Sequence, residues 1–100
     1  KSEYKKDAAL EKEIADCEKW TGEFLAKVRE YKNITIQKMS LTTKINSYYI
    51  TAIEKMDPES LPAPVFIRGY VVQMARLLGL DDKKVADSYM KELKANSSLK

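Results

Sequence analysis

Four times along the chain, a polar residue stands between two apolar residues that are five positions apart, which is the pattern of a helix start. The polar side chain can accept a hydrogen bond from a free backbone N–H, and the apolar pair packs across it as a hydrophobic staple. The four capping residues are Thr21, Thr35, Asn46 and Asp81, with staples Trp20–Leu25, Ile34–Met39, Ile45–Ile50 and Leu80–Val85. We find no credible strand between these starts, so the sequence predicts an all-α domain.

Helix ends are marked just as locally. Asn33 is suited to a left-handed stop, Asp57–Pro58 ends a helix because the residue before proline avoids helical dihedral angles, and Gly79 closes another helix. Together, the starts and ends predict helices at about 22–32, 36–42, 47–56, 64–78 and 82–95. We therefore expect a compact domain of five to six helices over residues 21–95, a leading amphipathic helix within 1–20, extending from Ser2 to about Lys19, and a frayed tail at 96–100.

The short helix at 36–42 and the helix at 47–56 have the spacing of a helix-turn-helix, a short helix joined by a tight turn to a second one. Ile36, Met39 and Ser40 are expected to face inward. Many such motifs place glycine in the turn, where this chain has Lys44. The layout predicts a lambda-repressor-like arrangement.

Composition argues against several kinds of chemistry. The chain has no histidine and one cysteine, Cys17, so we predict neither a metal site nor a cofactor, and no enzyme activity. The acidic residues Glu54, Asp57 and Glu59 do not have the spacing of a calcium loop, and we interpret them as a solvated helix end. No apolar run is long enough to span a membrane.

If the motif binds DNA, the start of its second helix would present side chains to the bases. That face would be Ser47, Tyr48, Thr51 and Lys55. It contains no arginine, the side chain that most often recognises guanine, and Glu54 is expected to repel phosphate. The net charge of +3 is mild for a nucleic-acid-binding protein. DNA binding is therefore the alternative hypothesis rather than the leading one.

Aromatic residues offer a second candidate surface. Phe66 and Tyr70 are four residues apart and share one face of a helix. An apolar stripe formed by Val65, Val72, Ala75 and Leu78 is expected to face the core and could bury one of them. Tyr48 and Tyr49 point about 100° apart on a helix, so one is expected in the core and the other on the surface.

From about Thr21 to Tyr89 the sequence resembles the RodZ-type helix-turn-helix domain of bacterial cell-shape proteins. The matching segments are GEFLAKVRE at 22–30, ITIQKMSLTTKI at 34–45, YYITAIEKMDPESLPAPVFIRGYV at 48–71 and ARLLGLDDKKVADSYM at 75–90. The most specific part is LPAPVFIRGY followed by LGLD. A variant of this domain, found in larger bacterial proteins downstream of a J-domain, is similar at KWTGEFLAKVRE and LPAPV.

The resemblance implies a non-catalytic, cytoplasmic protein–protein interaction domain. In the RodZ family this domain docks on the actin-like filament protein MreB through aromatic residues on the helix after the proline loop. Those positions correspond to Phe66 and Tyr70, with Arg68 and Gly69 between them. RodZ continues into a transmembrane helix, so the resemblance also allows membrane tethering of the full-length protein. The J-domain variant leaves open a different bacterial protein as the partner.

Overall fold

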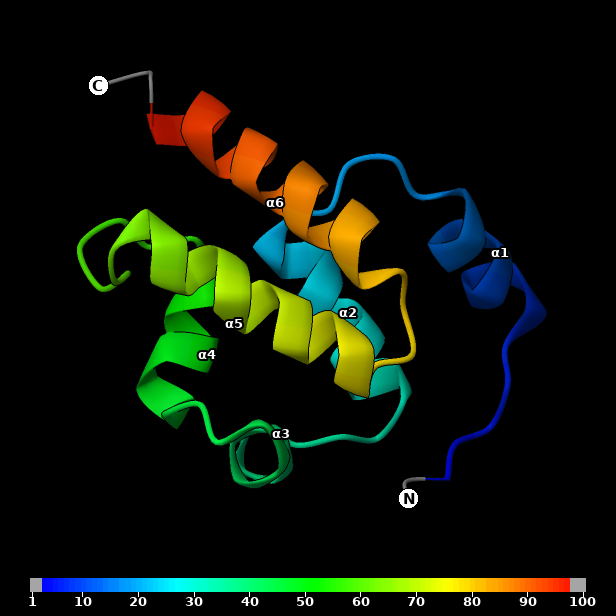
Figure 1. Cartoon of the computed structure of the whole chain (residues 1–100). Helices are drawn as coiled ribbons and strands as arrows, with labels where there is room; N and C mark the ends of the chain where they lie inside the picture. The colour runs from blue at the N-terminus through cyan, green and yellow to red at the C-terminus, as the bar shows by residue number, and fades with distance from the viewer. Residues whose placement is uncertain (1–2, 98–100) are drawn as a thin grey trace.

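A computed structural model describes residues 3–97, and within that range the chain forms six α-helices and no strand. Figure 1 shows them gathered into one bundle. The helices are α1 (Ala8–Asp16), α2 (Gly22–Tyr31), α3 (Ile36–Thr43), α4 (Ser47–Lys55), α5 (Pro64–Leu77) and α6 (Asp82–Ser97). The prediction of an all-α domain with a helix-turn-helix at α3–α4 is confirmed.

All four predicted caps accept hydrogen bonds from backbone N–H groups near the starts of their helices. The donors lie two or three residues beyond each cap, at 2.8–3.2 Å, and are Phe24, Lys38, Tyr48 and Lys84. The staple residues are buried, except for the partly buried Leu80. These four helix starts are therefore fixed by a capping side chain and an apolar staple, as the local sequence predicts.

Three non-glycine residues adopt left-handed backbone conformations at helix ends. Asn33 has φ 59°, as predicted for a stop, and Lys44 and Met56 have φ 66° and 51°. Lys44 thus takes the turn geometry for which other helix-turn-helix motifs use glycine, at a steric cost that its Cβ imposes. The turn is also held by Ser40, whose hydroxyl donates to the Ile45 carbonyl at 2.5 Å.

The core lies where α5 packs against α6 and α4, and where α4 packs against α2. α3 packs against both α4 and α5, and α4 also packs against α5. Both helices of the helix-turn-helix therefore rest on α5. In Figure 1, α5 crosses the front of the bundle, α4 lies near its start, and α1 stands at the opposite side. The largest fully buried side chains are Tyr89, Leu25, Met39, Ile50, Ile53 and Met74.

The leading helix is shorter than predicted. α1 begins after Asp7, whose carboxylate accepts from the N–H groups of Ala9 and Leu10, and ends at Asp16. It contains no buried residue, so packing does not extend it toward the predicted ends. Lys1 and Ser2, at the start of the predicted segment, lie outside the described residues.

The C-terminal helix is longer than predicted. α6 continues to Ser97, so the first two positions of the predicted frayed tail, Asn96 and Ser97, are helical. The rest of that tail, residues 98–100, lies outside the described part of the chain. None of the described helices is both long and apolar enough to cross a membrane.

Candidate docking surface

Four aromatic rings form a continuous row across the junction of α4 and α5. The centroids of Tyr48 and Tyr49 are 5.4 Å apart, and that of Tyr49 is 5.9 Å from Tyr70. Phe66 completes the row, 6.5 Å from Tyr70. These separations fall in the range of favourable ring–ring contacts. We call these four residues the aromatic row.

The ends of the aromatic row are exposed and its middle is anchored. Phe66 is 56% exposed and Tyr48 is 57% exposed, whereas Tyr49 and Tyr70 are partly buried against the core. Residues Ile67 and Val71 are buried in the core and fix the rotation of α5, which leaves Phe66 at the helix edge. The row thus presents large apolar side chains on a base that packing holds in place.

The predicted inward stripe on α5 is wrong at its first residue. Val65 was expected in the core but is 74% exposed, because Ile67, Val71 and Met74 form the buried side of the helix instead. Gly69 lies on the open side of α5, since no heavy atom lies within 4 Å of the position that a Cβ would take there. Exposed apolar surface therefore continues from the aromatic row onto the outer face of α5.

Arg68 does not belong to this surface. Its guanidinium pairs with the Asp87 carboxylate on α6 at 2.7 Å, and both side chains are substantially exposed. Residues two apart on a helix point about 200° from each other, so Arg68 faces away from both Phe66 and Tyr70. Of the three predicted docking residues, the structure brings Phe66 and Tyr70 together and places Arg68 elsewhere.

The predicted recognition face also gathers on one side of its helix. Ser47, Tyr48 and Lys55 are exposed on α4, and Thr51 is half-buried between them. Tyr48 belongs to this face and to the aromatic row, so the two candidate surfaces meet at one side chain. Two predictions made from separate stretches of sequence therefore describe adjoining parts of the molecule.

Residues 24–85 match the family described as a helix-turn-helix domain, and this stretch is more than half of the chain. The chain belongs to the helix-turn-helix domain family. No curated protein and no solved structure matches this chain. The matched stretch of the helix-turn-helix domain includes the whole aromatic row, whereas α1 lies outside it.

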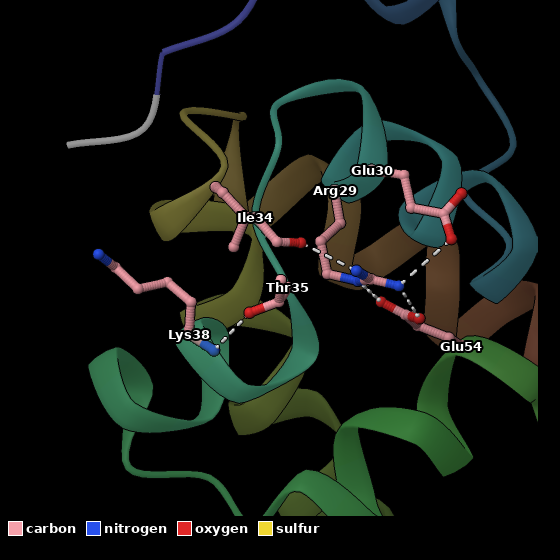
Figure 2. Close-up of polar contacts among 6 residues, drawn as sticks. All are labelled: Arg29, Glu30, Ile34, Thr35, Lys38 and Glu54. Atoms are coloured by element: carbon pink, nitrogen blue, oxygen red, sulfur yellow. Dashed lines mark hydrogen bonds and ion pairs between the residues drawn. The ribbon is translucent and has the colours of Figure 1, made fainter.

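Within the helix-turn-helix domain, a buried ion pair fixes the second helix of the motif. Arg29 on α2 donates from Nε and Nη2 to the two carboxylate oxygens of Glu54 on α4, at 2.7 and 3.1 Å (Figure 2). Nη1 of the same guanidinium donates to the Ile34 carbonyl at 2.9 Å. The side chains of Arg29 and Glu54 are only 8% and 7% exposed. One guanidinium thus joins α2, the segment before α3, and α4.

This ion pair corrects two expectations about Glu54. The sequence predicts that Glu54, like Asp57 and Glu59, lies at a solvated helix end and repels phosphate. Its carboxylate is instead buried and neutralised by Arg29. Asp57 has a local role, accepting hydrogen bonds from the Glu59 N–H and the Ser60 hydroxyl. Glu54 is therefore a buried structural residue, whereas Asp57 caps a turn.

A sequence signal for the ion pair existed. Arg29 follows the buried Leu25 by four residues, and Glu54 follows the buried Ile50 by four. Positions four apart lie on the same helix face, so each charge stands on an inward stripe. Opposite charges on two facing inward stripes indicate a buried ion pair, since burying a charge without a partner would be destabilising.

Cys17 is half-buried and lies outside the aromatic row. Burial raises the pKa of the Cys17 thiol above its ordinary value. A raised pKa keeps the thiol protonated and weakly nucleophilic at neutral pH. Among residues 3–97, no three histidine, cysteine or acidic side chains gather closely enough to hold a metal ion.

Proposed function

We propose that this helix-turn-helix domain is a non-catalytic protein-binding module that docks through the aromatic row. The observation that carries the proposal is the exposure of Phe66 and Tyr48 at the two ends of a row whose middle is anchored in the core. Aromatic side chains on a rigid base are favoured anchors in protein interfaces because little conformational entropy is lost when they bind. Exposed Val65 extends the apolar area.

The resemblance to RodZ suggests the kind of partner. In that family, aromatics at the positions of Phe66 and Tyr70 bind the actin-like filament protein MreB, and here both side chains stand in one row. We propose a filament protein of this type as the partner, with the domain on the cytoplasmic side of the membrane. Another bacterial protein is the expected partner if the chain follows a J-domain.

The proposal is tested by cosedimentation of the chain with polymerised MreB from the same cell. Phe66→Ala and Tyr48→Ala are suitable variants because both side chains are more than half exposed. Each should weaken binding by about 2 kcal/mol or more, roughly 30-fold, as expected for an interface anchor. Tyr70→Ala is a poorer probe, since Tyr70 also packs against the core.

Leu41→Ala is the matched control, because Leu41 on α3 is 74% exposed and is not in the aromatic row. It should bind as the unchanged chain does. Circular dichroism should show equal helix content in all variants. Equal binding by Phe66→Ala, Tyr48→Ala and the unchanged chain would exclude docking through this surface.

A second candidate function, DNA binding, is favoured by the arrangement of α4. Ser47, Tyr48 and Lys55 share an exposed face, and the buried pairing of Glu54 removes a charge expected to repel phosphate. The face still lacks arginine. Duplex binding measured across a salt series separates the candidates, because DNA binding weakens steeply with added salt. Tight binding with a steep salt slope, weakened in Lys55→Gln, would favour DNA.

A further inference from the structure

A groove of about 690 Å³ lies at the far end of α5 from the aromatic row. Its walls include Tyr4 from the leading segment, Lys32 after α2, Lys38 on α3, and Leu77 and Leu78 at the end of α5. Phe66 and Leu78 are twelve residues apart on this helix, about 18 Å at the helical rise. The groove is thus separate from the proposed docking surface, and its volume is that of a small-molecule site.

The two charged residues in the groove are both lysines. Lys32 is partly buried, donates from Nζ to the Leu78 carbonyl at 2.6 Å, and lies 5.7 Å from the centre of the Tyr4 ring. Lys38 is exposed on the wall formed by α3. Over residues 3–97, neither ammonium forms an ion pair with a carboxylate. The groove therefore has positive charge without a counter-charge.

The remaining lining is mainly apolar: Leu77 and the ring of Tyr4 are accessible, and the buried residues Ile34 and Leu78 lie beneath them. Tyr4 is held there by an edge contact with Tyr31, with ring centroids 4.9 Å apart. An apolar surface bordered by ammonium groups that form no ion pair complements a ligand that is apolar along its length and anionic at one end.

We propose that this groove binds a small amphiphilic carboxylate, with its chain against Leu77 and the ring of Tyr4 and its carboxylate between Lys32 and Lys38. The ammonium of Lys32 is already oriented by a carbonyl and a ring, so binding completes its set of partners at little entropic cost. The leading segment forms one wall through Tyr4, which lies outside the stretch matched to the helix-turn-helix family. The site therefore requires the leading segment as well as the helix-turn-helix domain.

The test is titration of the isotopically labelled full chain with octanoate, followed by amide chemical shifts. Saturable shifts should concentrate at Ile34, Leu78 and Gly79, and 1-octanol at equal concentration should bind at least about tenfold more weakly because it lacks the charge. Lys38→Gln should weaken octanoate binding about tenfold. Lys55→Gln, which changes an exposed lysine on α4, should have no effect.

Equal affinity for octanoate and octanol would overturn the proposal, as would shifts scattered over the surface or unchanged binding by Lys38→Gln. Tyr4→Ala supplies a second variant, since it removes an apolar wall without touching a charge, and it should also weaken binding. Phe66→Ala should leave octanoate binding intact. Octanoate binding and partner binding can therefore be lost separately, which distinguishes failure of this site from failure of the docking surface.

Discussion

Gly22 occupies the point where α2 passes closest to α4. A Cβ at this position would overlap the backbone carbonyl oxygens of Ile53 and Glu54, which cannot move without shifting α4. We expect Gly22→Ala to lower the free energy of unfolding by about 1–3 kcal/mol, as for other overpacked sites. Urea denaturation measures this change.

Gly69→Ala is the matched control for that substitution. Gly69 is also helical, but nothing lies within 4 Å of the Cβ that would be added. Alanine should therefore raise the free energy of unfolding by about 0.5–1 kcal/mol, through helix propensity alone. A rise in the free energy of unfolding for both substitutions would show that α2 and α4 are not in close contact.

The buried pair of Arg29 and Glu54 should be costly to break from one side. Arg29→Met leaves the Glu54 carboxylate buried without a partner, and we expect a loss of about 3–5 kcal/mol in the free energy of unfolding. The double variant Arg29→Met, Glu54→Leu should recover much of that loss, because no charge then remains buried. Thermal and urea unfolding of the single and double variants measure the coupling.

The exposed pair of Lys12 and Asp16 on α1 serves as the comparison. Lys12→Met should change the free energy of unfolding by less than about 0.5 kcal/mol, since exposed ion pairs contribute little. Equal effects of Arg29→Met and Lys12→Met would contradict the assignment of Arg29 as the anchor of α4.

Tyr89 makes the stability of the domain depend on pH in the alkaline range. Its hydroxyl donates to the Ile53 carbonyl at 2.7 Å, and burial raises the pKa of the Tyr89 phenol well above its ordinary value. In the unfolded chain this phenol ionises near pH 10, while the folded chain keeps it protonated. The stability it contributes is thus present below about pH 10 and is lost as pH rises above that value.

We expect Tyr89→Phe to reduce this alkaline loss while lowering the free energy of unfolding at pH 7 by about 1 kcal/mol, the contribution of one hydrogen bond. Urea denaturation at pH 7, 9 and 11 measures both effects. An unchanged slope between pH 9 and 11 would show that Tyr89 does not carry the dependence.

At the scale of helices, local chemistry predicted most boundaries and failed where tertiary contacts decide. Thr21, Thr35, Asn46 and Asp81 cap as expected because a cap needs only the next few N–H groups. The length of α1 was overestimated because helical periodicity does not reveal whether a face has anything to pack against. Asp7 caps the start of this helix, which buries no residue and packs only the partly buried Ile14 against the core.

Tyr31 is one of the residues that hold the leading segment to the domain, beside Asn33 and Lys27. The Tyr31 hydroxyl accepts from the Asp7 N–H at 2.9 Å and donates to the Glu11 carboxylate at 2.6 Å. Tyr31→Phe removes both hydrogen bonds, and we expect faster amide hydrogen exchange throughout α1. Exchange in α5 should stay unchanged, because α1 contributes no buried residue to the core. Equal protection of α1 in both proteins would show that other contacts hold it.

At the scale of the whole molecule, the sequence indicated which aromatic residues belong to the candidate surface, but it did not predict that they form one continuous row. Phe66 and Tyr70 are one turn apart, so their pairing is a local property. Their continuity with Tyr48 and Tyr49 depends on how α4 meets α5, which no periodicity encodes. Arg68 was grouped with them by proximity in sequence, although its partner is on α6. The groove beside Tyr4 likewise joins distant segments.

We propose the aromatic row as the surface where a partner protein binds. The most direct measurement is the footprint of polymerised or monomeric MreB on the isotopically labelled chain, mapped by amide chemical shifts and line broadening. We predict that the affected amides gather at Tyr48, Tyr49, Phe66, Gly69 and Tyr70. A footprint confined to α1 or α6, or no response at saturating MreB, would contradict docking through this surface.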